Sequence, residues 1–168
     1  MPATYKKIQS VNLSSAQANI DFSSIPATYD DLILYVSVRS AGSFTNRDMG
    51  LKINNGTSIA WRYLRGDGSS VASSNGSATN YVGTMPAASN TASTFGSTMF
   101  YIPNYATSTN KSISVDSTGE NNATSSEIGF WAVLWSGAAA INQLTIYDPS
   151  SNNLVQHSSA ILYGIKKY

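Results

Sequence analysis

Two adjacent carboxylates, Asp30 and Asp31, stand directly before the apolar run "LILYVSV". A pair of acids is the chemistry of glycoside hydrolases, whose two carboxylates lie roughly 5–9 Å apart across a shared cleft. Adjacent residues of a strand point to opposite faces of a sheet, so these two side chains would not converge on one sugar. Asp30 also suits a turn. The pair is therefore interpreted as the start of a strand.

Few other residues offer catalysis or metal binding. His157 is the only histidine, and its Ser-rich surroundings contain no nucleophile elbow, so no Ser-His-Asp triad is visible. One histidine and no cysteine exclude the usual zinc ligand sets. The segments "NRD", "GDGSS" and "STGENN" contain oxygen ligands without the EF-hand spacing for calcium. The remaining acids form no recognisable site: Asp67, Asp116, Glu120 and Glu127. We expect no enzyme activity, no cofactor and no metal.

A second group of residues combines arginine with aromatic side chains: Arg47, Asp48, Trp61, Arg62, Tyr63 and Arg65. Arginine, tryptophan and tyrosine are typical anchors of protein interfaces. The alternative is that Trp61 and Tyr63 belong to the core while the arginines either extend along the surface to keep their charge in water or pair with Asp48. The tripeptide Arg65-Gly66-Asp67 matches an adhesion motif, but Gly-Asp-Gly is also ordinary turn chemistry.

Composition limits the classes of partner. Charged residues make up 11% of the 168-residue chain, while Ser, Thr and Asn supply about a third. A net charge of +1 without a basic cluster argues against nucleic-acid binding. No apolar run approaches the roughly 20 residues that span a bilayer, and the start lacks a signal-peptide core, so we expect a soluble chain made in a cytoplasm. A neutral, hydroxyl-rich surface suits contacts with proteins or sugars.

The elements that must position these residues are short strands. Alternating apolar residues between Gly, Asn, Ser and Pro clusters predict strands at about 5–12, 17–22, 31–40, 47–54, 57–64, 80–84, 95–103, 111–117, 126–135, 141–147 and 159–166. Asn54-Asn55-Gly56 predicts a hairpin turn near Asn55-Gly56, and residues 66–77 are predicted to form a long loop. Strands at this spacing predict one all-β domain over residues 1–168, a sandwich or barrel.

Two of these strands carry bulky residues at consecutive positions. The segments "STMFYIP" and "SEIGFWAVLW" are partly apolar on both faces, as expected for strands that contact a core on one side and a second surface on the other. We expect Tyr101, Phe130 or Trp131 to point outward and to take part in an interface with symmetry mates.

Several segments resemble a known group of proteins. The stretches "YKKIQSVNLSSAQANIDFSSIPATYDDLILYVSVRS", "WRYLRGDGSS", "YIPNYATSTNKSIS" and "AILYGIKKY" are similar to small β-rich virion proteins of tailed bacteriophages, described as head-associated or tail-fibre-like. The resemblance covers most of the chain. It implies a jelly-roll-like antiparallel β-sandwich, usually trimeric and exposed on a particle that is assembled in the bacterial cytoplasm.

The resemblance leaves two roles open. The first predicted strand begins by about residue 5, which leaves no room for the shaft of a tail fibre. We therefore expect a capsid decoration protein on the outer capsid surface, a homotrimer with the major capsid protein or other virion proteins as partners. The alternative is a tail or head fibre, or a receptor-binding, carbohydrate-binding module that contacts a host surface glycan.

Overall fold

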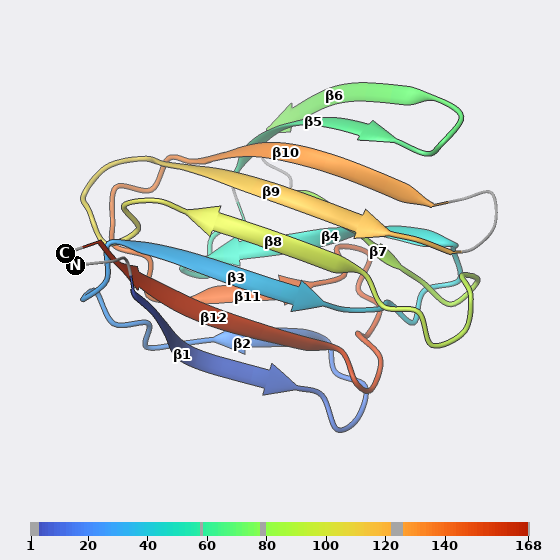
Figure 1. Cartoon of the computed structure of the whole chain (residues 1–168), viewed down its shortest axis with the longest axis horizontal. Helices are drawn as coiled ribbons and strands as arrows, with labels where there is room; N and C mark the ends of the chain where they lie inside the picture. Colours follow the sequence, from blue (N-terminus) through green and yellow to red (C-terminus); the bar gives the residue numbers. More distant parts are fainter. Residues whose placement is uncertain (1–3, 58, 78–79, 122–125, 168) are drawn as a thin grey trace.

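The computed structural model describes residues 4–57, 59–77, 80–121 and 126–167. Within these residues the regular structure consists of twelve β-strands without a helix (Figure 1). In chain order they are β1 (Thr4–Asn12), β2 (Asn19–Phe22), β3 (Asp31–Ser37), β4 (Asn46–Ile53), β5 (Ala60–Gly66), β6 (Val71–Ser77), β7 (Tyr81–Pro86), β8 (Ser97–Ile102), β9 (Lys111–Gly119), β10 (Glu127–Trp135), β11 (Leu144–Tyr147) and β12 (Ser159–Lys166).

Eight of the described strands have the connectivity of a jelly roll. They are β1, β2, β3, β4, β7, β8, β11 and β12. Counted in chain order, strands one, eight, three and six of this set form one sheet, in the order β1-β12-β3-β8. Strands two, seven, four and five form the other sheet, in the order β2-β11-β4-β7. This alternation between two packed sheets is the jelly-roll order. The prediction of an all-β, jelly-roll-like antiparallel sandwich is therefore confirmed.

Two inserted hairpins enlarge one of the sheets. The β5–β6 pair lies between the fourth and fifth jelly-roll strands, and the β9–β10 pair lies between the sixth and seventh. They extend the first sheet to β1-β12-β3-β8-β9-β10-β5-β6, here called the large sheet, while β2-β11-β4-β7 is the small sheet. Figure 1 shows β1 and β6 at the two edges of the large sheet.

The core fills the space between the two sheets, because each strand buries alternate residues. In β10, Trp131, Val133 and Trp135 are buried while Phe130 and Leu134 are exposed. The small-sheet strand β7 packs against β9 and β10, so the core continues beneath part of the extension. The largest fully buried apolar side chains include Phe22, Leu32, Leu34, Met49, Leu51, Ile53, Met85, Phe100, Ile102 and Tyr105.

The turn at Asn54 and Asn55 connects two sheets and is not a hairpin. Both residues have the left-handed φ that asparagine tolerates, 50° and 62°, and Ile53 and Gly56 exchange both backbone hydrogen bonds across them. The predicted turn is present. The predicted pairing of its flanking strands is wrong, because β4 joins the small sheet and β5 joins the large sheet.

The prediction of a long loop over residues 66–77 is also wrong. A short turn over residues 67–70 is followed by β6, which pairs with β5 from Val71 opposite Gly66 to Ser77 opposite Ala60. Almost all of β6 is exposed and only Val71 is a large apolar residue, so no alternation of apolar and polar residues indicates a strand. Pairing with β5 supplies the strand geometry that the composition of β6 does not predict.

Candidate functional site

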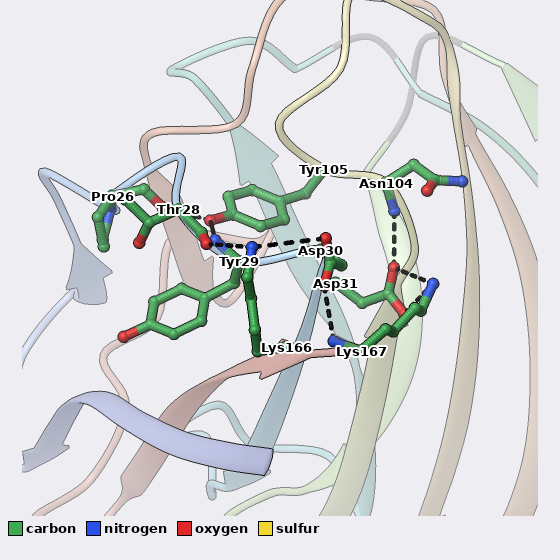
Figure 2. A network of polar contacts seen from close by, with 9 residues as sticks. All are labelled: Pro26, Thr28, Tyr29, Asp30, Asp31, Asn104, Tyr105, Lys166 and Lys167. Carbon is green, nitrogen blue, oxygen red and sulfur yellow. Dashed lines mark hydrogen bonds and ion pairs between the residues drawn. The ribbon is translucent and has the colours of Figure 1, made fainter. Parts of the chain in front are cut away.

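The acid pair Asp30 and Asp31 holds the end of β12 (Figure 2). Asp31 begins β3, is 1% exposed and accepts hydrogen bonds from the Tyr101 hydroxyl at 2.7 Å and the Asn104 N–H at 3.0 Å. The Lys167 Nζ lies 2.8 Å from its Oδ2 atom. Burial alone raises the pKa of Asp31, but the hydrogen bonds from these three donors outweigh it and hold the pKa below its usual value.

Asp30 binds the same C-terminal segment through different atoms. Its carboxylate accepts the Lys167 backbone N–H at 2.7 Å, and its own N–H donates to the Ile165 carbonyl at 2.8 Å. Lys166 Nζ lies 3.9 Å from Asp30 Oδ1. The interpretation of the pair as a strand start is confirmed for Asp31, and the structure adds a clasp, formed by Asp30, Asp31 and Lys167, that the sequence pattern does not reveal.

The inner face of the extension gathers three of the predicted interface aromatics: Trp61, Tyr63 and Trp131. The Trp61 and Tyr63 rings stack with centroids 5.5 Å apart, and Tyr63 and Trp131 lie 5.7 Å apart. Trp61 lies against Gly76 of β6, where a Cβ atom would approach its ring to 2.5 Å. Trp131 is 4% exposed, so the expectation that it points outward is wrong. The alternative assignment to the core is correct for Trp61, and Tyr63 is half-buried.

The outer face of the extension is apolar. Phe130 lies opposite Leu64, and Ile128 lies opposite Gly66, which in turn lies opposite Val71. These residues belong to a surface that we call the apolar face: Leu64, Val71, Ile128, Phe130 and Leu134, all exposed. Each of them is between 43% and 75% exposed, and contiguous exposed apolar side chains of this kind commonly serve an interaction. The expectation that Phe130 points outward is confirmed, at 55% exposure.

Two more of the predicted interface residues lie on the outer side of the large sheet. Arg62 is exposed and lies opposite Ala132 of β10, between the Leu64–Phe130 pair and Leu134, so it places one charge within the apolar face. Tyr101 also occupies the outer face of the large sheet, opposite Ile33, but it is half-buried and its hydroxyl is committed to Asp31. Tyr101 therefore contributes to the clasp more than to an accessible surface.

A pocket of about 480 Å³ is lined by the first residues of β4 and β10, by the end of β5 and by Tyr81 at the start of β7, which lies opposite Gly50 of β4. It brings together Arg47 and Arg65, which are eighteen positions apart in sequence, with Asp48 and Glu127. Arg65 Nη1 lies 3.1 Å from Glu127 Oε1. Arg47 Nε lies 3.7 Å from the buried carboxylate of Asp148. The expected pairing of these two arginines with Asp48 is therefore wrong. Arg65 pairs with Glu127 of β10, and Arg47 pairs with Asp148, which directly follows β11.

The remaining motifs have local roles. In the Arg65-Gly66-Asp67 tripeptide, the Asp67 carboxylate accepts the backbone N–H groups of Ser69 and Ser70 at 2.9 and 2.7 Å, which lowers its pKa well below the usual range and confirms the turn interpretation. His157 is exposed, and its positive φ of 71° places it in the turn before β12.

The described residues contain no group of three or more His, Cys, Asp or Glu side chains placed to hold a metal ion. In the same part of the chain, no helix has the length and apolar character needed to cross a membrane. Comparison with protein-family models, with curated proteins and with solved structures gives no match to this chain.

Proposed function

We propose that the chain is a structural virion protein of a tailed bacteriophage, a decoration protein that binds the outer capsid surface as a homotrimer. The observation that carries this proposal is the apolar face formed by Leu64, Val71, Ile128, Phe130 and Leu134. Five large apolar side chains on one side of two neighbouring strands and an edge strand need a partner surface in the assembled state. The jelly roll is a recurrent architecture of viral capsid domains, which supports the role by analogy of fold.

The size and charge of the apolar face favour other copies of the chain as its occupant. A standard interface covers about 800 Å² per partner, and the chain exposes 8210 Å². The apolar face continues into the neutral, exposed Ser and Asn residues of β6, which enlarges the surface that a second copy could cover. Apart from Arg62, the described residues of β6, β5 and β10 that point outward carry no charge, so identical copies approach without strong repulsion.

In the proposed assembly, three copies turn the apolar face toward a common three-fold axis. Closed cyclic symmetry suits a protein that repeats over a lattice. The ends of the sandwich then remain available for the major capsid protein or other virion proteins. Neither the low net charge nor the described surface provides the basic patch that nucleic-acid binding requires.

The test uses the full chain and phage particles that lack it. Mass photometry should report three times the 17.9 kDa chain mass. The added trimer should rebind to the particles and raise their disruption temperature, and electron microscopy should place it on the capsid. A strict monomer, or a trimer found only at the tail tip, would contradict the decoration role and favour the receptor-binding alternative.

A further inference from the structure

The pocket at the end of the sandwich has rigid walls of mixed charge. Arg65 is held by Glu127, whose second oxygen accepts the Thr84 hydroxyl at 2.9 Å. Arg47 is held by Asp148, and its guanidinium carbon lies 4.6 Å from the centre of the Phe44 ring. Each arginine is therefore fixed on one side and can still donate hydrogen bonds from its remaining N–H groups.

Asp48 is the acid of the pocket that has no fixed partner. It makes no hydrogen bond or ion pair shorter than 4 Å with another residue in the described part of the chain, and its side chain opens on the pocket. Its side chain is exposed, yet the pocket walls partly desolvate it, which raises its pKa; Glu127 and Asp148 act in the same direction, while Arg65 and Arg47 oppose them. A bound molecule that donates hydrogen bonds could replace the water that solvates this accessible carboxylate.

The charges of the pocket nearly offset one another. Arg47 and Arg65 attract an anion and repel a cation, while Asp48, Asp67 and Glu127 do the reverse, so the lining gives neither kind of ion a clear advantage. A neutral molecule with several hydroxyl groups meets no repulsion and satisfies both the acceptor and the donors. Its hydroxyl groups would form charge-assisted hydrogen bonds with the ionised side chains of the pocket, and such bonds are stronger than hydrogen bonds between two neutral groups.

Two exposed aromatic rings complete the pocket. Phe44 is 58% exposed and Tyr81 is 39% exposed, and both line the same space as Asp48. An aromatic ring offers a flat apolar surface to the C–H groups of a pyranose, while the polar groups around it fix orientation. The volume of about 480 Å³ lies within the range of small-ligand sites.

We propose that this pocket binds a neutral saccharide, with Asp48 accepting sugar hydroxyl groups, Arg65 and Arg47 donating to them, and Phe44 or Tyr81 packing against the sugar C–H face. The pocket is separate from the apolar face, because neither Phe130 nor Leu64 lines it. The inference therefore does not depend on the decoration role. A saccharide site would give the protein a means to contact a cell-surface glycan.

The test is a titration of the full ¹⁵N-labelled chain with three classes of probe, followed by NMR. The neutral probes are glucose, galactose, mannose and N-acetylglucosamine, the anionic probe is galacturonic acid, and the cationic probe is glucosamine. We expect at least one neutral sugar to give saturable shifts of the backbone amides around Asp48 and Tyr81. Absence of binding by every neutral probe, or stronger binding of either charged probe, would overturn the proposal.

Variants locate the site. Asp48→Asn and Phe44→Ala should each weaken binding of that sugar by about tenfold, because they remove the charged acceptor and the stacking surface. Tyr5→Ala is the matched control, because Tyr5 is as exposed as Phe44 but lies outside both the pocket and the apolar face, and it should leave the affinity unchanged. If Asp48→Asn does not fold, Phe44→Ala alone decides. Unchanged affinity in a folded Phe44→Ala variant would overturn the assignment.

Discussion

The two edges of the large sheet differ in how they resist pairing with another chain. The edge strand β1 carries Lys6 and Lys7, and its register with β12 shifts between Lys7 and Gln9. The edge strand β6 carries no charge, no proline and no register shift in its pairing with β5. Edge lysines and bulges are the usual protection against edge-to-edge association. The chain therefore protects one edge and leaves the edge beside the apolar face unprotected.

The two edges are also held in place by different interactions. Near β1, the C-terminal end of β12 is tied to β3 by the clasp of Asp30, Asp31 and Lys167. At the opposite edge, β6 is held by its pairing with β5 and by Trp61 lying on Gly76. The clasp edge is therefore fixed by buried side-chain contacts, whereas the β6 edge leaves an uncharged strand with mostly exposed side chains open to a partner.

The largest loss of stability is expected from Asp31→Ala, at the clasp edge. The substitution leaves the Tyr101 hydroxyl, the Asn104 N–H and Lys167 without their acceptor, and should cost roughly 2–3 kcal/mol of unfolding free energy after allowance for the half-exposed Lys167. Chemical denaturation measures this value. Asp30→Ala removes the other carboxylate of the clasp and should cost less, about 1 kcal/mol, since its side chain accepts one hydrogen bond and its ion pair is exposed. A loss below about 1 kcal/mol in Asp31→Ala would contradict the clasp.

A smaller loss is expected from Gly76→Val, at the β6 edge. The new Cβ atom would lie 2.5 Å from the Trp61 ring, so the ring must move, at a cost of about 1–3 kcal/mol. Ser73→Val, which points outward opposite Leu64, should change stability by less than about 0.5 kcal/mol. Thermal unfolding, with Trp fluorescence as the probe, measures both. A Gly76→Val variant as stable as Ser73→Val would show that Trp61 does not anchor β6.

The smallest effect is a dependence of stability on pH at the clasp. Because the pKa of Asp31 is lower in the folded than in the unfolded chain, its stabilising contribution is complete above about pH 4 and is lost as the pH falls through the folded pKa. The difference in unfolding free energy between the wild type and Asp31→Asn should therefore shrink between pH 5 and pH 2. A difference that stays constant over this range would contradict the ionised clasp.

The sequence predicts the sandwich and most strands because their core residues alternate, as in β10 from Glu127 to Trp135. The same alternation places Phe130 and Trp131 on opposite faces without indicating which face meets the core, and the outward assignment of Trp131 fails for that reason. The strand β6 has too few apolar residues to show alternation at all. Its geometry depends on β5.

The pocket could not be predicted, because its residues come from segments far apart in the chain. Asp48 and Glu127 line the same pocket only because β4 and β10 begin at the same end of the sandwich. No spacing within the sequence indicates that these two residues lie close together. The composition nevertheless identified Arg47 and Arg65 as candidates for contact, and both line the pocket. The clasp was missed for the same physical reason, since Lys167 lies at the opposite end of the sequence from Asp31.

The central claim is that the apolar face beside β6 is the surface through which copies of the chain associate. The most direct measurement is the solution mass of Phe130→Lys and Tyr5→Lys, since these two side chains are 55% and 56% exposed and lie near opposite edges of the large sheet. Mass photometry should find single chains of 17.9 kDa for Phe130→Lys and trimers for Tyr5→Lys. A trimeric Phe130→Lys variant, or a monomeric wild type, would contradict the account.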